Sequence, residues 1–224
     1  MKFEEYPDRD ALWMGLADRL ASALGEAVRG SDGGASLCVP GGTTPGPVFD
    51  LLSAARLDWD RVTVFLNDER WVPESSERSN GRLVRQRLIT DRAAAATFLP
   101  LWSDHATPEE GLPALTEALQ PHLPISVLLL GMGGDMHTAS LFPGADRLAE
   151  ALAPDAPLLV PMRAEAAGEP RVTISAPYLA GALQIHVLIT GDEKRAALER
   201  AQGLPPEEAP IRAVLSNATV HWAA

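Results

Sequence analysis

The sequence predicts an α/β fold in which a mainly parallel sheet carries helices on both faces. Apolar, β-prone runs alternate with segments of helical periodicity, as expected when each strand is followed by a crossover helix. The run "ISVLLL" (125–130) is apolar at nearly every position, which is typical of a strand buried on both faces. Segments rich in glycine, threonine and charge follow these runs. Because parallel sheets bind ligands at the carboxyl ends of their strands, we expect the functional site there.

The expected elements begin with a helix over 8–28, where an apolar residue recurs every four positions from Leu12 to Val28. "GSDGG" ends this helix. The remaining elements, in chain order, are strands over 35–40 and 61–66, a helix capped by Ser79 or Asn80, a strand over 125–130, weaker strands over 158–161 and 171–175, a strand over 184–190, and a helix over 191–201. The Pro- and Ala-rich stretch 145–170 is expected to be rich in loops. We find no convincing domain boundary, so residues 1–224 are expected to form a single α/β domain.

The composition argues against several classes of function. Lys and Arg number 19 against 30 Asp and Glu, and the formal net charge of -11 disfavours nonspecific binding to nucleic acids or anionic membranes. Cys38 is the only cysteine, which rules out an intrachain disulfide and is typical of a reducing compartment. The N-terminus has no apolar signal core, and no apolar stretch approaches the roughly 20 residues of a membrane span. We expect a cytoplasmic protein that binds neither nucleic acid nor membrane.

The segment "PGGTTPGP" follows the first predicted strand and has the composition of an anion-binding turn. Gly41 and Gly42 allow the backbone to approach a ligand closely. Thr43 and Thr44 add hydroxyl groups, and Pro45 suits the first turn of a helix, whose free N–H groups attract anions. The pattern matches neither a Walker A sequence nor a dinucleotide-binding fingerprint. An ordinary tight strand-to-helix turn is the alternative interpretation.

The segment "NDERWVP" places three charged residues directly after the second predicted strand. Asp68 and Arg70 are therefore expected beside a cleft at the sheet edge. The alternative is a salt-bridged loop in which Trp71 fills the core. Glu69 is the member of this set that we expect to be structural.

The segment "GMGGDMH" follows the third strand and brings a carboxylate and an imidazole two residues apart. His137 can act as a general base, and Asp135 can orient it if the glycines supply a sharp turn. A structural histidine is the alternative, whereas metal binding is disfavoured because no second His or Cys lies at ligand spacing. Of the other histidines, His186 is expected in a strand and His221 in a terminal segment, without assigned roles.

Two further cationic residues lie in the second half of the chain. Arg171 begins the strand after Pro170, and Lys194 lies in the first turn of the last predicted helix. The helix macrodipole disfavours a cation in that turn, so Lys194 makes more sense if an anion binds nearby. Pairing of Lys194 with Asp192 or Glu193 is the alternative.

Together these residues resemble the 6-phosphogluconolactonase family. The resemblance is carried by "CVPGGTTP", "FLNDERWVP", "ERSNGRLVRQRL", "LLLGMGGDMHTASLFPG", "RVTIS" and "LITGDEKRAAL", in the family's order. It implies a Rossmann-like α/β fold shared with glucosamine-6-phosphate deaminases. It also implies hydrolysis of 6-phospho-D-glucono-1,5-lactone to 6-phosphogluconate in the oxidative pentose phosphate pathway, with no metal or organic cofactor.

The resemblance also implies roles for the candidate residues. His137 would be the general base oriented by Asp135, with Asp68 and Arg70 as further catalytic residues. The phosphate would be held by Gly41, Gly42, Thr43, Thr44, Arg171 and Lys194. The partner would be a phosphorylated sugar lactone, and we expect a monomer or weak homodimer. Two alternatives remain: a sugar-phosphate isomerase or deaminase using the carboxylate after "FLN" as a base at carbon, and a non-catalytic sugar-phosphate sensor.

Met136 departs from the family pattern, which usually has Asp-Gly-His at this place. If the turn requires a positive φ, a methionine there is strained. We expect a positive φ at Met136; with a negative φ it would be an ordinary apolar lid on the turn.

Overall fold

The computed structural model describes the backbone of residues 1–224 and every side chain except that of Ala166. The helices are α1 (Arg9–Gly30), α2 (Gly46–Ser53), α3 (Asn80–Arg87), α4 (Pro108–Leu119), α5 (Leu148–Leu152), α6 (Ala176–Ala180), α7 (Asp192–Ala201) and α8 (Arg212–Leu215). The strands are β1 (Lys2–Glu5), β2 (Ala35–Val39), β3 (Val62–Leu66), β4 (Asp68–Arg70), β5 (Thr97–Leu99), β6 (Val127–Gly131), β7 (Leu159–Met162), β8 (Arg171–Ile174), β9 (Gln184–Thr190) and β10 (Ala218–Ala223). No helix in the described part of the chain is long and apolar enough to cross a membrane.

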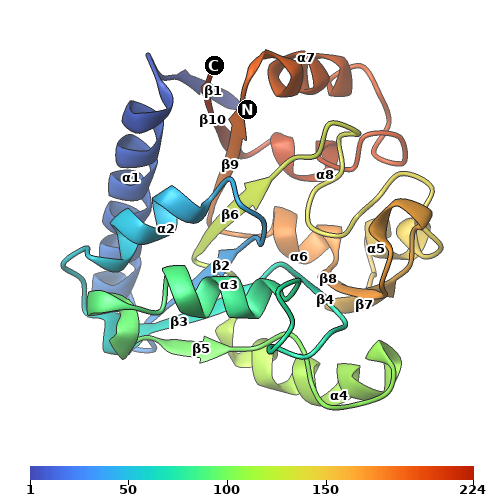
Figure 1. The fold of residues 1–224 in the computed structure, drawn as a ribbon, viewed down its shortest axis with the longest axis horizontal. Helices are drawn as coiled ribbons and strands as arrows, with labels where there is room; N and C mark the ends of the chain where they lie inside the picture. Colours follow the sequence, from blue (N-terminus) through green and yellow to red (C-terminus); the bar gives the residue numbers. More distant parts are fainter.

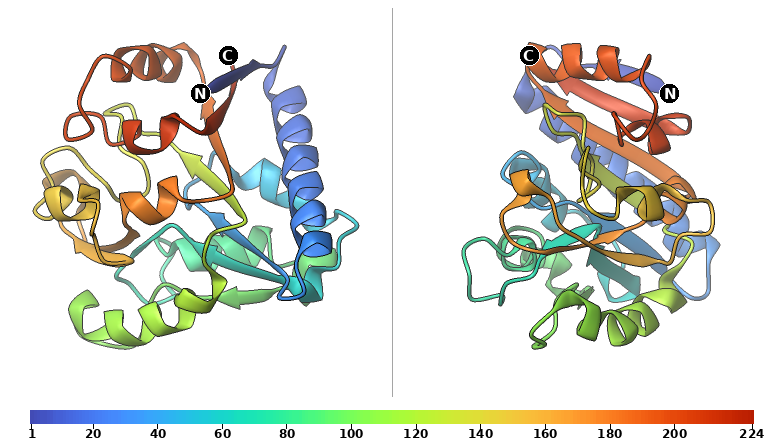
Figure 2. Two further views of the ribbon diagram at one scale, coloured as in Figure 1. Left: turned by 180° about the vertical axis from the view of Figure 1, so that it is seen from behind. Right: turned by 90° about the vertical axis from the view of Figure 1, so that its right-hand side faces the viewer.

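The predicted α/β fold is confirmed. Seven parallel strands form the main sheet in the order β1-β10-β9-β6-β2-β3-β5. Helices α1 and α2 lie on one side of this sheet, and α6 and α8 lie on the other (Figures 1 and 2). The interior strand β2 is consequently buried at every residue, which explains why its sequence is apolar apart from Ser36.

The sequence did not predict β1, β5 and β10, which lie at or next to the sheet edges. A second sheet of three antiparallel strands, in the order β4-β8-β7, was also not foreseen. The expected weak strands over 158–161 and 171–175 exist as β7 and β8, but they belong to this small sheet. Strand β4 is the charged triplet "DER", which carries no apolar signal and becomes a strand only because β8 pairs with it.

The order of the strands creates a crevice between β2 and β6. The next strand of the main sheet after β2 in the chain is β3, which lies on the side of β2 away from β6. The next one after β6 is β9, which lies on the side of β6 away from β2. Such a switch point opens a gap at the carboxyl ends of the two strands. The predicted glycine segments both leave the sheet at this point, the first after β2 and the second at the end of β6.

The small sheet is attached to the same end of the main sheet through Asn67. Its backbone N–H donates to Val39 O, and its carbonyl accepts from Ile174 N, so it joins β2 to β8. Its side chain is fully buried and donates to Leu129 O at 3.0 Å. The charged residues that follow Asn67 are thereby held over the crevice.

Two buried histidines lie side by side on β9 and β10. His186 Nδ1 is 3.0 Å from His221 Nε2, and His221 Nδ1 is 2.9 Å from the Tyr6 hydroxyl. Burial lowers the pKa of His186 to about 4 and that of His221 to about 3, with further lowering of each by the charge of Arg19. His221 does lie in the terminal segment, but that segment is the strand β10, which the sequence did not predict, and His221 is fully buried in it.

These lowered pKa values predict a stability that falls in mild acid. Below about pH 6.5 these two histidines bind protons in the unfolded chain, whereas in the folded protein they stay neutral until the pH approaches 4. The free energy of unfolding therefore decreases as the pH falls. For each histidine the loss between pH 7.5 and pH 5 is on the order of 2 kcal/mol. Thermal unfolding of the wild type and of the His186→Gln/His221→Gln variant at both pH values measures this. An equal decrease of the midpoint in both proteins would contradict it.

Candidate active site

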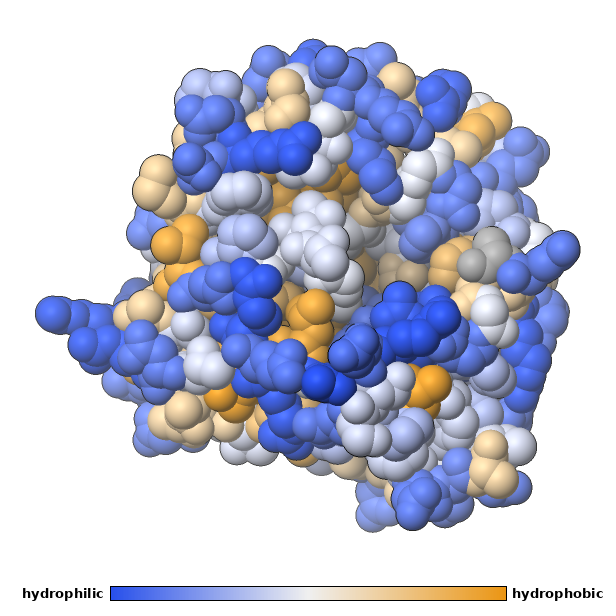
Figure 3. Space-filling view, in the orientation of Figure 1, coloured by the Kyte–Doolittle hydropathy of each residue, from blue (hydrophilic) through white to orange (hydrophobic). Residues whose placement is uncertain are grey.

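A cavity of about 390 Å³ opens where the carboxyl ends of β2, β6 and β9 face the small sheet. This volume suits a small ligand. The same face of the molecule is hollowed near its centre, with polar residues around the rim (Figure 3). The predicted site residues that line the cavity are Gly41, Gly42, Thr44, Asp68, Arg70, His137, Arg171 and Lys194. Thr43 is exposed and does not line it, and Asp135 lies behind His137.

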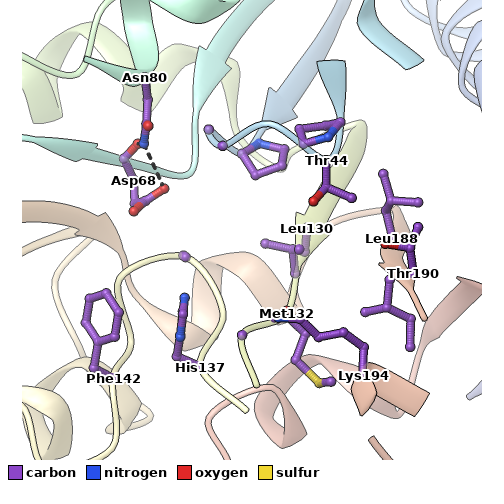
Figure 4. Close-up of a pocket in the computed structure, with 18 of the residues that line it drawn as sticks. Thr44, Asp68, Asn80, Leu130, Met132, His137, Phe142, Leu188, Thr190 and Lys194 are labelled. Carbon is purple, nitrogen blue, oxygen red and sulfur yellow. Dashed lines mark hydrogen bonds between the residues drawn. The ribbon is translucent and has the colours of Figure 1, made fainter. Parts of the chain in front are cut away.

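The loop before α2 forms one wall. The cap position of α2 is Pro45, and no side chain hydrogen-bonds to the first turn. Gly46 N donates to Thr43 O at 3.2 Å and Pro47 has no N–H group, so among the described residues only the Val48 N–H of this turn lacks a protein acceptor. Gly41 is required by a close approach, because a Cβ atom there would lie 1.9 Å from Asn80 Oδ1. Thr44 borders the same opening as Asp68, His137 and Lys194 (Figure 4).

Two arginines face each other across the small sheet. The antiparallel register pairs Arg70 on β4 directly with Arg171 on β8. Like charges in this arrangement destabilise a sheet unless negative charge lies between them. Asp68 supplies part of it, with Oδ2 3.6 Å from Arg171 Nη1. Burial lowers the pKa of Arg171, Asp68 opposes this, and Arg70 adds to it.

The arginine pair is not fully compensated by the protein. Within the described residues, the Nε–H groups of both Arg70 and Arg171 are buried without an acceptor. A buried donor left unpaired costs about 1–3 kcal/mol. Among the described residues, Asp68 is the one carboxylate that lines the cavity with Arg70, Arg171 and Lys194, so the cavity carries an excess of positive charge that suits an anionic ligand.

Asp68 is fixed by residues to which the sequence analysis gave no role in the site. Ser140 Oγ donates to Asp68 Oδ2 at 2.5 Å, and Asn80 Nδ2 lies 3.4 Å from Asp68 Oδ1. Phe142, two residues after Ser140, lines the cavity and lies under the Arg171 guanidinium at 5.7 Å. Ser140 and Phe142 both belong to the segment "HTASLFPG". The resemblance of this segment to the family was the only feature of the sequence that pointed to them.

Glu69 is structural, as expected. It is buried and accepts hydrogen bonds from the backbone N–H groups of Arg70, Asn80 and Gly81 at 2.7–2.8 Å and from the Ser79 hydroxyl. Burial raises the pKa of Glu69, and these four donors oppose the rise. The side chain of Ser79 caps α3 by accepting from Arg82 N, so of the two predicted capping residues Ser79 is the cap.

The carboxylate and imidazole after β6 form a pair. Asp135 Oδ1 lies 2.5 Å from His137 Nδ1 and accepts a further hydrogen bond from His137 N at 3.2 Å. The hydrogen bond with the His137 side chain lowers the pKa of Asp135. The predicted glycine turn is present, and Gly133 is essential to it because a Cβ atom there would lie 2.1 Å from His137 Nδ1. With Nδ1 held by Asp135, the Nε2 atom of His137 is the one left for chemistry.

Met136, between these two residues, has a φ of 67°. The predicted positive φ is confirmed. The side chain packs against the core, and the carbonyl accepts from Ile211 N at 3.1 Å. The surrounding structure therefore holds a methionine in a backbone region that favours glycine.

The Met136→Gly variant is expected to be more stable than the wild type. Relief of a strained backbone contributes about 1–3 kcal/mol, whereas the added entropy of the unfolded chain costs about 0.4–1 kcal/mol. Each 1 kcal/mol gained raises the unfolding midpoint of a chain this size by about 2–4 °C. Thermal unfolding measures the change, and a clearly lowered midpoint would contradict it.

Lys194 completes the cavity wall from the first turn of α7, as predicted. Its Nζ donates to Met132 O at 2.5 Å. Burial lowers the pKa of Lys194, and the charges of Asp135 and Glu193 oppose this. Within the described residues Lys194 forms no ion pair at contact distance, so the alternative of pairing with Asp192 or Glu193 does not describe this structure.

Comparisons with known proteins agree with this architecture. The family model described as "Glucosamine-6-phosphate isomerases/6-phosphogluconolactonase" matches residues 7–222. The chain is 43% identical to a 6-phosphogluconolactonase from Mesorhizobium japonicum, over 97% of this chain and 93% of that protein. It superposes with a TM-score of 0.96 on the crystal structure of a 6-phosphogluconolactonase from Shewanella baltica, at 37% identity over 100% of this chain and 98% of that one. A monomeric glucosamine-6-phosphate deaminase, 16% identical with a TM-score of 0.81, shares the fold. The chain therefore belongs to the glucosamine-6-phosphate isomerase/6-phosphogluconolactonase family.

Proposed function

We propose that this chain hydrolyses 6-phospho-D-glucono-1,5-lactone to 6-phosphogluconate in the oxidative pentose phosphate pathway. Relatives at up to 43% identity are 6-phosphogluconolactonases, whereas the deaminase likeness, at 16% identity, is one of fold alone. The observation that carries the proposal is the His137–Asp135 pair beside a cavity that also holds two opposed arginines. A single buried cysteine is consistent with action in the cytoplasm.

The proposed reaction begins with His137. Its Nε2 atom takes a proton from water, and the water oxygen forms a bond to the lactone carbonyl carbon. The Arg70 guanidinium stabilises the negative charge that develops on the carbonyl oxygen. The bond from that carbon to the ring oxygen then breaks, and the proton passes from His137 to the ring oxygen, which leaves as the C5 hydroxyl. Asp135 keeps the imidazole oriented and stabilises its protonated form.

The phosphate is the second point of attachment. We propose that the loop Gly41–Thr44, Arg171 and Lys194 hold it, because this glycine loop before α2 and two cations border the same cavity. An Arg guanidinium can bind phosphate with two parallel hydrogen bonds, and Lys adds a point charge. Binding at this remote group would hold the carbonyl carbon in register with His137.

An assay on freshly prepared lactone, corrected for its spontaneous opening, tests the proposal. Accelerated hydrolysis is expected. Ammonia release from glucosamine 6-phosphate would instead identify a deaminase, and binding of 6-phosphogluconate without turnover of the lactone would identify a sensor. Either of these two results, without lactone hydrolysis, would overturn the proposal.

A further inference from the structure

Asn80 joins three parts of the cavity wall through one side chain. It is almost fully buried, lines the cavity, and begins α3. Its Nδ2 donates to the Asp68 carbonyl at 3.0 Å and lies 3.4 Å from the Asp68 carboxylate. Its Oδ1 accepts from Arg70 Nη1 at 3.1 Å. The same amide packs against Gly41, where a Cβ atom would collide with it.

The chemistry of this position calls for a carboxamide. One neighbour is a carboxylate, which needs a donor, and the other is a guanidinium, which needs an acceptor. Asparagine supplies one of each from a short, rigid group. An aspartate would place a second negative charge beside Asp68, and an apolar residue would leave both neighbours without this partner.

The guanidinium of Arg70 has few other restraints. Nη1 also donates to Arg78 O at 2.6 Å, and the Nε–H group has no acceptor within the described residues. The carbonyl of Arg78 belongs to the loop before α3 rather than to the sheet. Asn80 is thus the side chain that ties the Arg70 guanidinium to the cavity wall.

We propose that Asn80 is a positioning residue that acts on lactone hydrolysis through Arg70. The inference rests on the proposed function and adds to it a residue outside the catalytic pair. Loss of the Asn80 amide frees the guanidinium to leave the place where it meets the developing negative charge. The consequence is a fall in kcat, with little change in the KM that the phosphate determines.

A double-mutant cycle on the full chain tests this dependence. The proteins are the wild type, Asn80→Ala, Arg70→Ala and the double variant, assayed with 6-phosphogluconolactone. Asn80→Ala is expected to lower kcat by about 10- to 100-fold, the effect of losing one hydrogen bond to a charged group. In the Arg70→Ala background the same change is expected to lower kcat by less than about threefold, because its target is already absent.

Ser79→Ala is the matched control. Ser79 caps the same helix and bonds to Glu69, but it does not line the cavity. It is expected to lower the unfolding midpoint while retaining near-normal kcat, which separates a loss of helix stability from a loss of positioning. If Asn80→Ala is too unstable to assay at 25 °C, the cycle is run at the highest temperature at which all four proteins are folded.

The outcomes are distinct. An undiminished fall of kcat on adding Asn80→Ala to Arg70→Ala would overturn the inference, since Asn80 would then act independently of Arg70. A rise in KM with unchanged kcat would also overturn it and assign Asn80 to the Gly41 loop. A wild type without lactonase activity would instead refute the proposed function, before any variant is compared.

Discussion

The His137→Ala variant is expected to hydrolyse 6-phosphogluconolactone with a kcat at least about 100-fold below that of the wild type. Loss of a positioned general base typically costs 10²- to 10⁴-fold, and the other charged groups of the cavity are arginines, a lysine and the Asp68 carboxylate already bound to Ser140. His137 is partly exposed, so its removal leaves no cavity in the core. Steady-state kinetics with correction for spontaneous opening measures the change.

Two controls accompany this variant. Binding of the product 6-phosphogluconate should be retained, because the proposed phosphate contacts lie on other elements. His122→Ala makes the same substitution at a histidine that does not line the cavity, and it should leave kcat unchanged. Near-normal kcat in His137→Ala would remove this residue from the mechanism.

The Arg171→Ala variant is expected to lose recognition of the phosphate. Its KM for the phosphorylated lactone should rise by about 10- to 100-fold, the effect of losing hydrogen bonds to a charged group. Its activity on unphosphorylated glucono-1,5-lactone should change far less. Assays of both lactones with the wild type and the variant provide the comparison, and equal losses on both would contradict the assignment.

Stability must be measured alongside these kinetics. Arg171 is buried and pairs with Asp68, so its removal leaves a buried carboxylate with less compensation. Arg163→Ala is a suitable control, because Arg163 is exposed, pairs with Glu109 and does not line the cavity. It should change neither substrate preference nor KM.

The structure also explains how a methionine is tolerated in the turn between Asp135 and His137. Met136 keeps a positive φ because its carbonyl is bound by Ile211 N and its side chain is packed. These contacts hold the backbone in the conformation that a glycine would adopt with less strain. The Asp135–His137 hydrogen bond is intact across it, so the departure from the family pattern does not disrupt the pair.

The sequence by itself determined the elements and sites that depend on local chemistry. The every-fourth-residue leucines of α1, the apolar run of β6 and the start of α3 at Ser79 or Asn80 are each encoded within a few residues. The same is true of the turn that brings Asp135 to His137, since glycines and the two functional groups lie in one short segment. Local periodicity and turn chemistry suffice for such features because their partners are near in sequence.

Only the tertiary structure decided how distant segments meet. The triplet "DER" is a strand because it pairs with β8, and this register places Arg70 opposite Arg171. The contacts of Ser140 with Asp68 and of Asn80 with Arg70 likewise join different elements. Neither the charge pattern nor the β-propensity of these segments predicts such contacts between distant residues. The free energy that fixes strand pairing and register comes from burial against the rest of the fold. The sequence therefore identified the Asp135–His137 pair, while the packing of two sheets created the charged cavity beside it.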